Sequence, residues 1–140
     1  MRAVVDTSVL VSGMLSRRSY PARVLDAWIL KRFEPVVSPE LVKEYINVPT
    51  RAKFAVLGPV EKRLQVLESL LSLPWVVMVH PEEKITAVTE DLQDNVVLEC
   101  AVCGRASWVV TGDKHLLGLK SFEGIAIVTA EQFAKGVLDL

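Results

Sequence analysis

AVVD (Ala3–Asp6) and WVVTGD (Trp108–Asp113) are two apolar runs that each end on an aspartate. Short, continuous apolar runs of this kind are typical of strands that are buried on both faces. A carboxylate beside an apolar core loses its hydration without compensation, so it is costly unless it has a role. The two aspartates are therefore interpreted as parts of one site.

The composition predicts a well-packed single domain over residues 1–140. Hydrophobic residues make up 51% of the chain and charged residues 24%, and a formal net charge of -1 provides no global cationic field for nucleic acid. No apolar run approaches the roughly 18 residues that span a bilayer, and the start lacks the apolar region of a signal peptide. We therefore expect a cytoplasmic protein with no membrane contact.

Short Val-rich runs alternate with longer segments of helical periodicity. The segment between the first strand and Pro21 is expected to be a loop, and residues 80–93 a polar connection with a short strand near Ile85. Gly104 is expected to be a left-handed helix cap. Strands are predicted at 2–5, 33–37, 75–79, 107–110 and 125–128, and helices at 21–32, between Ser38 and Pro49, between Gly58 and Pro74, at 94–103, and after a capping box at Thr129–Gln132.

This alternation predicts an α/β fold, a three-layer α/β/α arrangement around a central parallel sheet of about five strands. Right-handed crossovers then place every strand carboxyl end and every helix amino end on the same edge of the sheet. Ligands bind at that edge, at the switch point in strand order. The residues at that edge can therefore be identified from the sequence.

Four acids from distant segments are expected at this edge. Asp6 and Asp113 follow the first and fourth strands, Asp94 starts the helix that leads to the fourth strand, and Glu44 lies beside the apolar stripe of the helix after the second strand. Each has a simpler interpretation. Asp6 and Asp113 could be turn residues, Asp94 an N-cap (a role that Asp91 could equally fill), and Glu44 a solvated helical side chain.

Carboxylates within about 4 Å of each other repel by roughly 4 kcal/mol per pair at an effective dielectric constant near 20. A hard divalent cation such as Mg2+ or Mn2+ is the natural counter-charge, and such ions are often held by few carboxylates together with substrate phosphate. A bound ion would activate water for hydrolysis of a phosphate ester. Hydroxyls of Thr7, Ser8 and Thr111 flank the strand-end acids, where they could orient these acids or water.

The four acids lie in four short sequence motifs. The motifs are VVDTSVL at Val4–Leu10, SPELVKE at Ser38–Glu44, DLQDN at Asp91–Asn95 and VTGDKHLL at Val110–Leu117. Together they resemble the PIN-domain family of metal-dependent ribonucleases. Their order and the structure expected between them match the family over nearly the whole chain, and the last motif is similar to VapC-type toxins of toxin–antitoxin pairs.

By this resemblance, Asp6, Glu44, Asp94 and Asp113 carry over as the catalytic residues and ligands of Mg2+ or Mn2+, with Ser8 and Asp91 as supports. Leu92-Gln93 departs from the family pattern, which leaves open whether Asp91 or Asp94 is the better ligand. The resemblance also implies an endoribonuclease that is the toxin of a pair. It further implies a cognate antitoxin that covers the cleft, and a homodimer or higher oligomer.

Other residues receive weaker interpretations. Histidine 115 is not expected to be catalytic, because its helical neighbours suggest packing, and the three tryptophans are expected in the core. Cys100 and Cys103 are predicted to be buried, reduced thiols.

The competing function is a non-catalytic PIN-like module that binds RNA or protein. Candidate RNA contacts, which could equally be solvated surface, are Arg17, Arg18, Arg51 and Lys53.

Overall fold

A six-stranded, mostly parallel sheet forms the centre of the computed structural model, which describes residues 1–47, 58–89 and 91–140. The strand order is β3-β2-β1-β4-β6-β5, and every neighbouring pair is parallel except β5 and β6. The chain therefore reverses its direction of winding between β1 and β4. The strands are β1 (Arg2–Val5), β2 (Glu34–Val37), β3 (Val77–Met78), β4 (Trp108–Val110), β5 (Ser121–Phe122) and β6 (Ile125–Val128).

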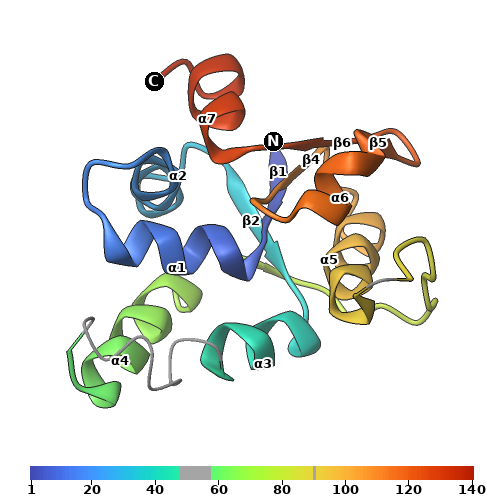
Figure 1. The fold of residues 1–140 in the computed structure, drawn as a ribbon. Coiled ribbons are helices and arrows are strands. Elements are labelled where there is room, and N and C mark those ends of the chain that lie inside the picture. The colour runs from blue at the N-terminus through green and yellow to red at the C-terminus, as the bar shows by residue number, and fades with distance from the viewer. Residues whose placement is uncertain (48–57, 90) are drawn as a thin grey trace.

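Helices cover both faces of this sheet, which confirms the three-layer α/β/α prediction. Figure 1 shows α1 and α2 on one side of the strands and α5 and α6 on the other. No helix of the described residues has the length and apolar character that crossing a bilayer requires. The helices are α1 (Thr7–Leu15), α2 (Tyr20–Ile29), α3 (Pro39–Asn47), α4 (Val60–Leu71), α5 (Leu92–Cys103), α6 (Lys114–Leu119) and α7 (Ala130–Gln132), which continues into a π-helical turn (Phe133–Val137).

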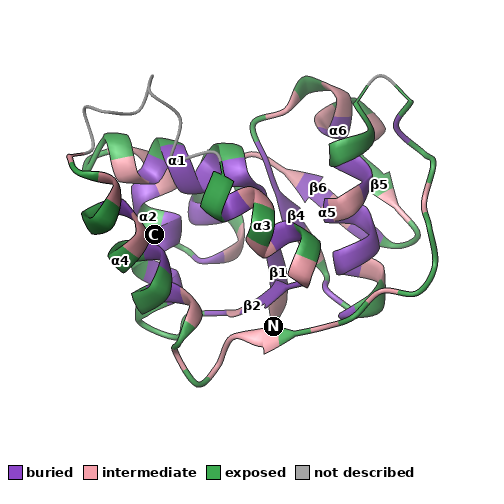
Figure 2. Cartoon of the chain, turned by 90° about the horizontal axis from the view of Figure 1, so that it is seen from below, coloured by how far each residue is buried: buried purple, intermediate pink, exposed green. Residues whose placement is uncertain are grey.

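The core lies on both sides of β1, whose Ala3, Val4 and Val5 are fully buried (Figure 2). Trp28 is fully buried between helices, and its indole N–H donates to the carbonyl of Leu70 at 3.0 Å. A large aromatic ring with its polar atom satisfied is a stable core residue. The expectation that this tryptophan belongs to the core is therefore confirmed.

Helix α1 occupies the segment that was expected to be a loop, so that expectation was wrong. Its sequence, TSVLVSGML, buries residues around most of its circumference and therefore lacks the one-sided pattern by which a surface helix is recognised. Gly13 allows the close approach of α2, because a Cβ atom there would lie 2.6 Å from the Leu25 Cδ1 atom. The apolar helix thus packs closely against α2.

Three further expectations needed correction. The predicted strand at 75–79 is only two residues long, the described residues near Ile85 form no strand, and β5 and α6 were not predicted. Gly104 ends α5 with a φ of -84°, so it is not a left-handed cap. A side chain there is excluded for another reason: a Cβ atom would lie 2.3 Å from Val36 Cγ1.

The two cysteines differ in their surroundings. Both are free thiols, but Cys100 is buried whereas Cys103 is exposed, so the prediction of burial holds only for Cys100. Burial raises the pKa of the Cys100 thiol to about 12. Neither residue belongs to a group of potential metal ligands among the described residues.

Candidate metal-binding acidic site

Asp6 lies where β1 ends beside β4. Val5 pairs with Val110, and the backbone N–H of Asp6 donates to the carbonyl of Val110 at 2.9 Å. The carboxylate is 5% exposed. Its Oδ1 accepts the N–H of Thr7 at 2.8 Å and so caps α1, and its Oδ2 accepts the hydroxyl of Thr111 at 2.7 Å. Three neighbouring segments thus fix this buried acid.

Asp113 is held in a similar way at the start of α6. Its Oδ1 accepts the N–H groups of His115 at 2.8 Å and Leu116 at 3.1 Å, which caps that helix. Its own N–H donates at 3.0 Å to the Thr111 hydroxyl, which in turn donates to Asp6. Thr111 therefore couples the positions of the two strand-end aspartates.

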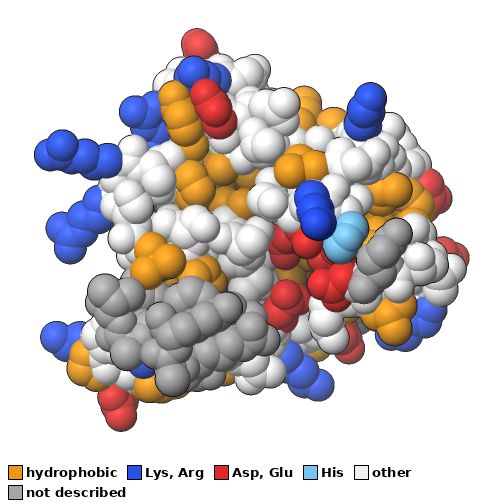
Figure 3. Space-filling view, viewed as in Figure 1, with side chains coloured by type: hydrophobic (Ala, Val, Ile, Leu, Met, Phe, Trp, Pro, Cys, Tyr) orange, Lys and Arg blue, Asp and Glu red, His pale blue; other side chains and the backbone are white. Residues whose placement is uncertain are grey.

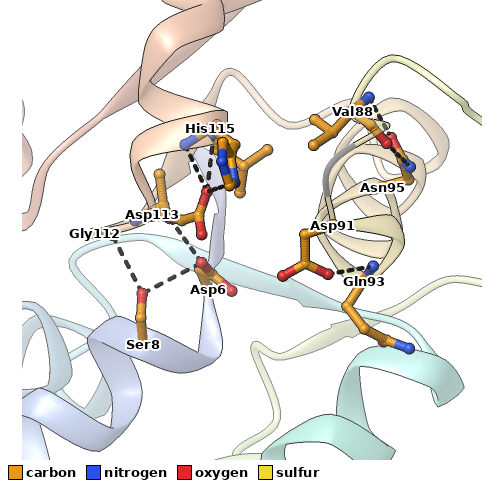
Figure 4. Close-up of polar contacts among 11 residues, drawn as sticks. Asp6, Ser8, Val88, Asp91, Gln93, Asn95, Gly112, Asp113 and His115 are labelled. Carbon is orange, nitrogen blue, oxygen red and sulfur yellow. Dashed lines mark hydrogen bonds and ion pairs between the residues drawn. The ribbon is translucent and has the colours of Figure 1, made fainter.

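Ser8 forms a second bridge between the same two loops (Figure 4). Its hydroxyl donates to Asp6 Oδ2 at 3.3 Å and accepts the N–H of Gly112 at 3.2 Å. Orientation of candidate ligands by neighbouring hydroxyls is typical of metal sites. The structure thus places Ser8 and Thr111 in direct contact with a candidate ligand.

Helix α5 contributes two acids in different environments. Asp91 is exposed and is the N-cap, since its Oδ1 accepts the N–H of Gln93 at 3.0 Å. Asp94 lies in the first turn and is only 6% exposed. The amide of Asn95 exchanges two hydrogen bonds, of 2.7 and 2.9 Å, with the backbone of Val88 and so fixes the preceding loop. The buried position of Asp94 favours it over Asp91 as the stronger ligand.

Glu44 comes from α3, whose Leu41 and Tyr45 are fully buried. The hydroxyl of Tyr45 donates to the carbonyl of Val5, the residue before Asp6. This bond ties α3 to the end of β1. Glu44, one position before Tyr45, is half-buried and reaches the same space as the other acids.

The acids share one cavity of about 440 Å3, which we call the acid-lined cavity. Figure 3 shows it as a patch of acidic side chains beside a histidine. Helices α1, α5 and α6 begin here, and the partial positive charge of their amino ends favours carboxylates. The structure therefore brings together all four predicted ligands and Asp91: the acids are Asp6, Glu44, Asp91, Asp94 and Asp113. Their roles stay a prediction.

The crowding of carboxylates changes their proton affinities. Burial raises the pKa of Asp94 to about 8, reinforced by a hydrogen bond with Asp113 and by the charges of Asp113, Asp91 and Asp6. Burial also raises the pKa of Asp6. Asp113 is the opposite case: hydrogen bonds from the Leu116 backbone, Asp94 and the His115 backbone outweigh its burial and lower its pKa. A proton on Asp94 thus reduces the negative charge in the absence of a cation.

The residues present fit a divalent cation. Oδ2 of Asp94 is buried and accepts a hydrogen bond from no donor among the described residues, and the hydrogen bond of this carboxyl with Asp113 requires a proton, which a cation would replace. One ligand atom each from Asp94, Asp113 and His115 lie within 4.8 Å of one another. Carboxylate oxygens suit Mg2+ and Mn2+. His115 was not predicted to be a functional residue. Its position two residues after Asp113 was the signal that could have identified it as a candidate ligand.

Two of the four predicted RNA-binding cations, Arg17 and Arg18, do not line the acid-lined cavity. Arg17 and Arg18 are exposed and follow the carboxyl end of α1, which is nine residues long. At 1.5 Å per residue, that end lies about 14 Å from the end at which Asp6 caps the helix. Arg51 and Lys53 lie outside the described residues.

Comparisons with known proteins agree with this fold. The chain is 27% identical over 123 residues, 86% of its length and 76% of the relative's, to uncharacterized protein MJ1680 of Methanocaldococcus jannaschii. Its fold is similar to the crystal structure of PAE2754 from Pyrobaculum aerophilum, with a TM-score of 0.67, 18% identity, and coverage of 100% of this chain and 91% of that chain. A family model described as PIN domain matches residues 2–115, and the chain therefore belongs to the PIN domain family.

Proposed function

We propose that this protein is a Mg2+- or Mn2+-dependent endoribonuclease that hydrolyses phosphodiester bonds of RNA. PIN domains are generally nucleases that use a divalent metal, which makes this activity the natural expectation for the chain. The observation that carries the proposal is the buried Oδ2 of Asp94, which no hydrogen-bond donor in the described residues reaches although it faces a cavity lined by acids. An oxygen in that position needs a proton or a cation.

Charge considerations connect the cavity to a phosphate substrate. Four or five carboxylates would repel an RNA backbone, so the cavity favours RNA only when their charge is offset. A bound divalent ion supplies that offset and lowers the pKa of a water molecule at the scissile phosphate. Thr111 and Ser8 orient the Asp6 carboxylate, and the amino end of α6 orients Asp113. The chain thus presents fixed oxygens before any substrate arrives.

Purified protein incubated with structured RNA tests this proposal directly. Cleavage is expected with Mg2+ or Mn2+ and is expected to stop when EDTA is added. Asp94→Asn should abolish cleavage, whereas Asp26→Asn, on the exposed face of α2 and outside the acid-lined cavity, should not. RNA binding without cleavage by the wild-type protein would instead support the alternative, a non-catalytic PIN-like binding module.

We also propose that the enzyme acts in the cytoplasm as the toxin of a toxin–antitoxin pair and forms a homodimer or higher oligomer. The support is the similarity of VTGDKHLL (Val110–Leu117) to VapC-type toxins. A cognate antitoxin would cover the acid-lined cavity and exclude RNA. Expression of the chain alone should arrest growth, and expression of Asp94→Asn should not. Unchanged growth with soluble, active protein would contradict the toxin role.

A further inference from the structure

His115 lies beside the two most closely spaced acids of the acid-lined cavity. One of its ring nitrogens and one oxygen from each of Asp94 and Asp113 all lie within 4.8 Å of one another. Within residues 1–47, 58–89 and 91–140, this is the single group of three or more His, Cys, Asp or Glu side chains with that spacing. Figure 4 shows the imidazole next to the Asp113 carboxylate.

The local backbone explains why the ring lies there. Asp113 caps α6 by accepting the N–H of His115 at 2.8 Å, so His115 is in the first turn of that helix. Its Nδ1 lies 3.8 Å from Asp113 Oδ1, is buried, and has no hydrogen-bond partner among the described residues. Leu116 is fully buried and performs the packing role, so His115 is not required for it.

A second and independent atom points to the same place. Oδ2 of Asp94 belongs to a side chain that is 6% exposed, and no donor in the described part of the chain reaches it. Buried polar atoms are satisfied in most native structures, so a pair of orphaned atoms at one spot indicates a missing partner. A cation accepts electron pairs from both a carboxylate oxygen and an imidazole nitrogen, so one ion would satisfy both atoms.

We propose that His115 supplies a nitrogen ligand to the divalent cation at this site and thereby makes the site prefer Mn2+ over Mg2+. The inference deepens the proposed function and depends on it for the presence of a cation. Imidazole is a good ligand for transition metals, whereas Mg2+ takes almost only oxygen. Opposite ligands of a small octahedral ion are about 4.2 Å apart, twice a bond of ~2.1 Å, so the observed grouping needs little adjustment.

Electron spin echo spectroscopy of Mn2+ bound to the tag-free protein tests this proposal. The chain has only two histidines, and the other, His80, is exposed in a different cavity. Imidazole nitrogen coupling to Mn2+ is expected in the wild-type protein and in His80→Ala, and it should disappear in His115→Ala. Mn2+ bound without nitrogen coupling in the wild-type protein would overturn the proposal.

Replacement of the nitrogen ligand by oxygen tests the metal preference. In competition binding, His115→Asp is expected to lower the ratio of Mn2+ to Mg2+ affinity at least about tenfold relative to wild type. An unchanged ratio would contradict the proposal. The outcomes separate the two ideas: nitrogen coupling without RNA cleavage would refute only the ribonuclease function, and cleavage without nitrogen coupling would refute only the role of His115.

Discussion

Two cavities of this protein have the same volume, about 440 Å3, and both are lined by acids, yet they differ in chemistry. The second, which we call the loop cavity, lies between residues 80–85 and α5 and is lined by His80, Glu82, Glu83 and Glu99 among others. Glu82 and Glu83 are exposed, and no ligand group forms there among the described residues. Acids and a histidine near a cavity are therefore not sufficient for a metal site.

The buried acid of each cavity shows what separates them. Glu99 is 8% exposed, but its Oε2 accepts the N–H of Ile85 at 2.9 Å and so holds the loop against α5. Asp94 is equally buried, but its Oδ2 has no donor in the described residues. A buried carboxylate that is hydrogen-bonded supports structure, whereas one that lacks a donor indicates a ligand. This difference leads to four predictions.

The largest expected effect is the loss of RNA cleavage when Asp6 is replaced. Asp6→Asn retains the size of the side chain but removes a candidate ligand charge, and cleavage should fall at least ~100-fold, since loss of residues that merely support ligands costs 10- to 100-fold. Glu99→Gln, in the loop cavity, should change the rate less than about threefold. Equal losses in both variants, measured as initial rates on one RNA, would remove the distinction between the cavities.

The second prediction concerns the pH dependence of metal binding. Because the pKa of Asp94 is raised to about 8, a cation must displace a proton below that pH. Affinity for Mn2+ should therefore rise by up to about tenfold per pH unit between pH 6 and 8 and then level off. Titration calorimetry in buffers of different ionisation enthalpy should detect the released proton at pH 7. Asp94→Asn should bind weakly and without this slope; an equal slope would assign the proton to another group.

The third prediction contrasts the stability of the two cavities in metal-free protein. Glu99→Ala leaves the N–H of Ile85 without its acceptor and should lower the free energy of unfolding by about 1–3 kcal/mol. Asp94→Asn should have the opposite effect at pH 9, where it removes a charge from a crowded site, and should raise stability by at least about 1 kcal/mol.

The sign of the pH effect follows from the direction of the Asp94 shift. Its native pKa lies above the value of the unfolded chain, so the native state binds more protons between about pH 4 and 8. Stability from this group is fully present below about pH 4 and is lost progressively as the pH rises to about 8. The advantage of Asp94→Asn should accordingly be about half as large at pH 6 and vanish near pH 4 in thermal unfolding, and an advantage that does not depend on pH would indicate a packing effect instead.

The smallest effect is expected at the predicted RNA contacts. Arg17→Ala combined with Arg18→Ala should weaken RNA binding two- to threefold and reduce the slope of log affinity against log salt by about 1.4, because each contact to a single strand contributes about 0.7. Lys84→Ala, an exposed cation beside the loop cavity, is the control and should leave the slope unchanged. An unchanged slope in the double variant would remove these arginines from the interface.

The strand-end acids were predictable because buried parallel strands are continuous apolar runs. AVVD and WVVTGD each end where the run ends, and the topology alone then brings Asp6 and Asp113 to one edge. The surroundings of Asp94 and Glu44 were predictable for the same reason, since helices start at that edge. What the pattern could not distinguish was Asp94 from Asp91, because that depends on which carboxylate packs against Asp113.

Other features were missed because the sequence contains no one-sided apolar pattern for them or because the elements are very short. The apolar character of α1 extends around the helix, so it has no amphipathic period, and β5 is a two-residue strand at the sheet edge. His115 was assigned to packing because its helical neighbours are Leu116 and Leu117. Its backbone N–H donates to Asp113 Oδ1 and holds the residue beside that acid, and its position two residues after Asp113 was the only sequence signal of this contact.

Asp6 and Asp113 each cap a helix as well as line the cavity, and this double use affects how relatives should be interpreted. Loss of an N-cap costs about 1 kcal/mol, so a descendant that abandoned catalysis would still be under selection to keep both aspartates for folding. Asp94 caps no helix and, without a cation, strains the fold by its burial among like charges. An inactive branch should therefore discard the counterpart of Asp94 first, and that single position is the marker by which enzymes and degenerate paralogues can be sorted.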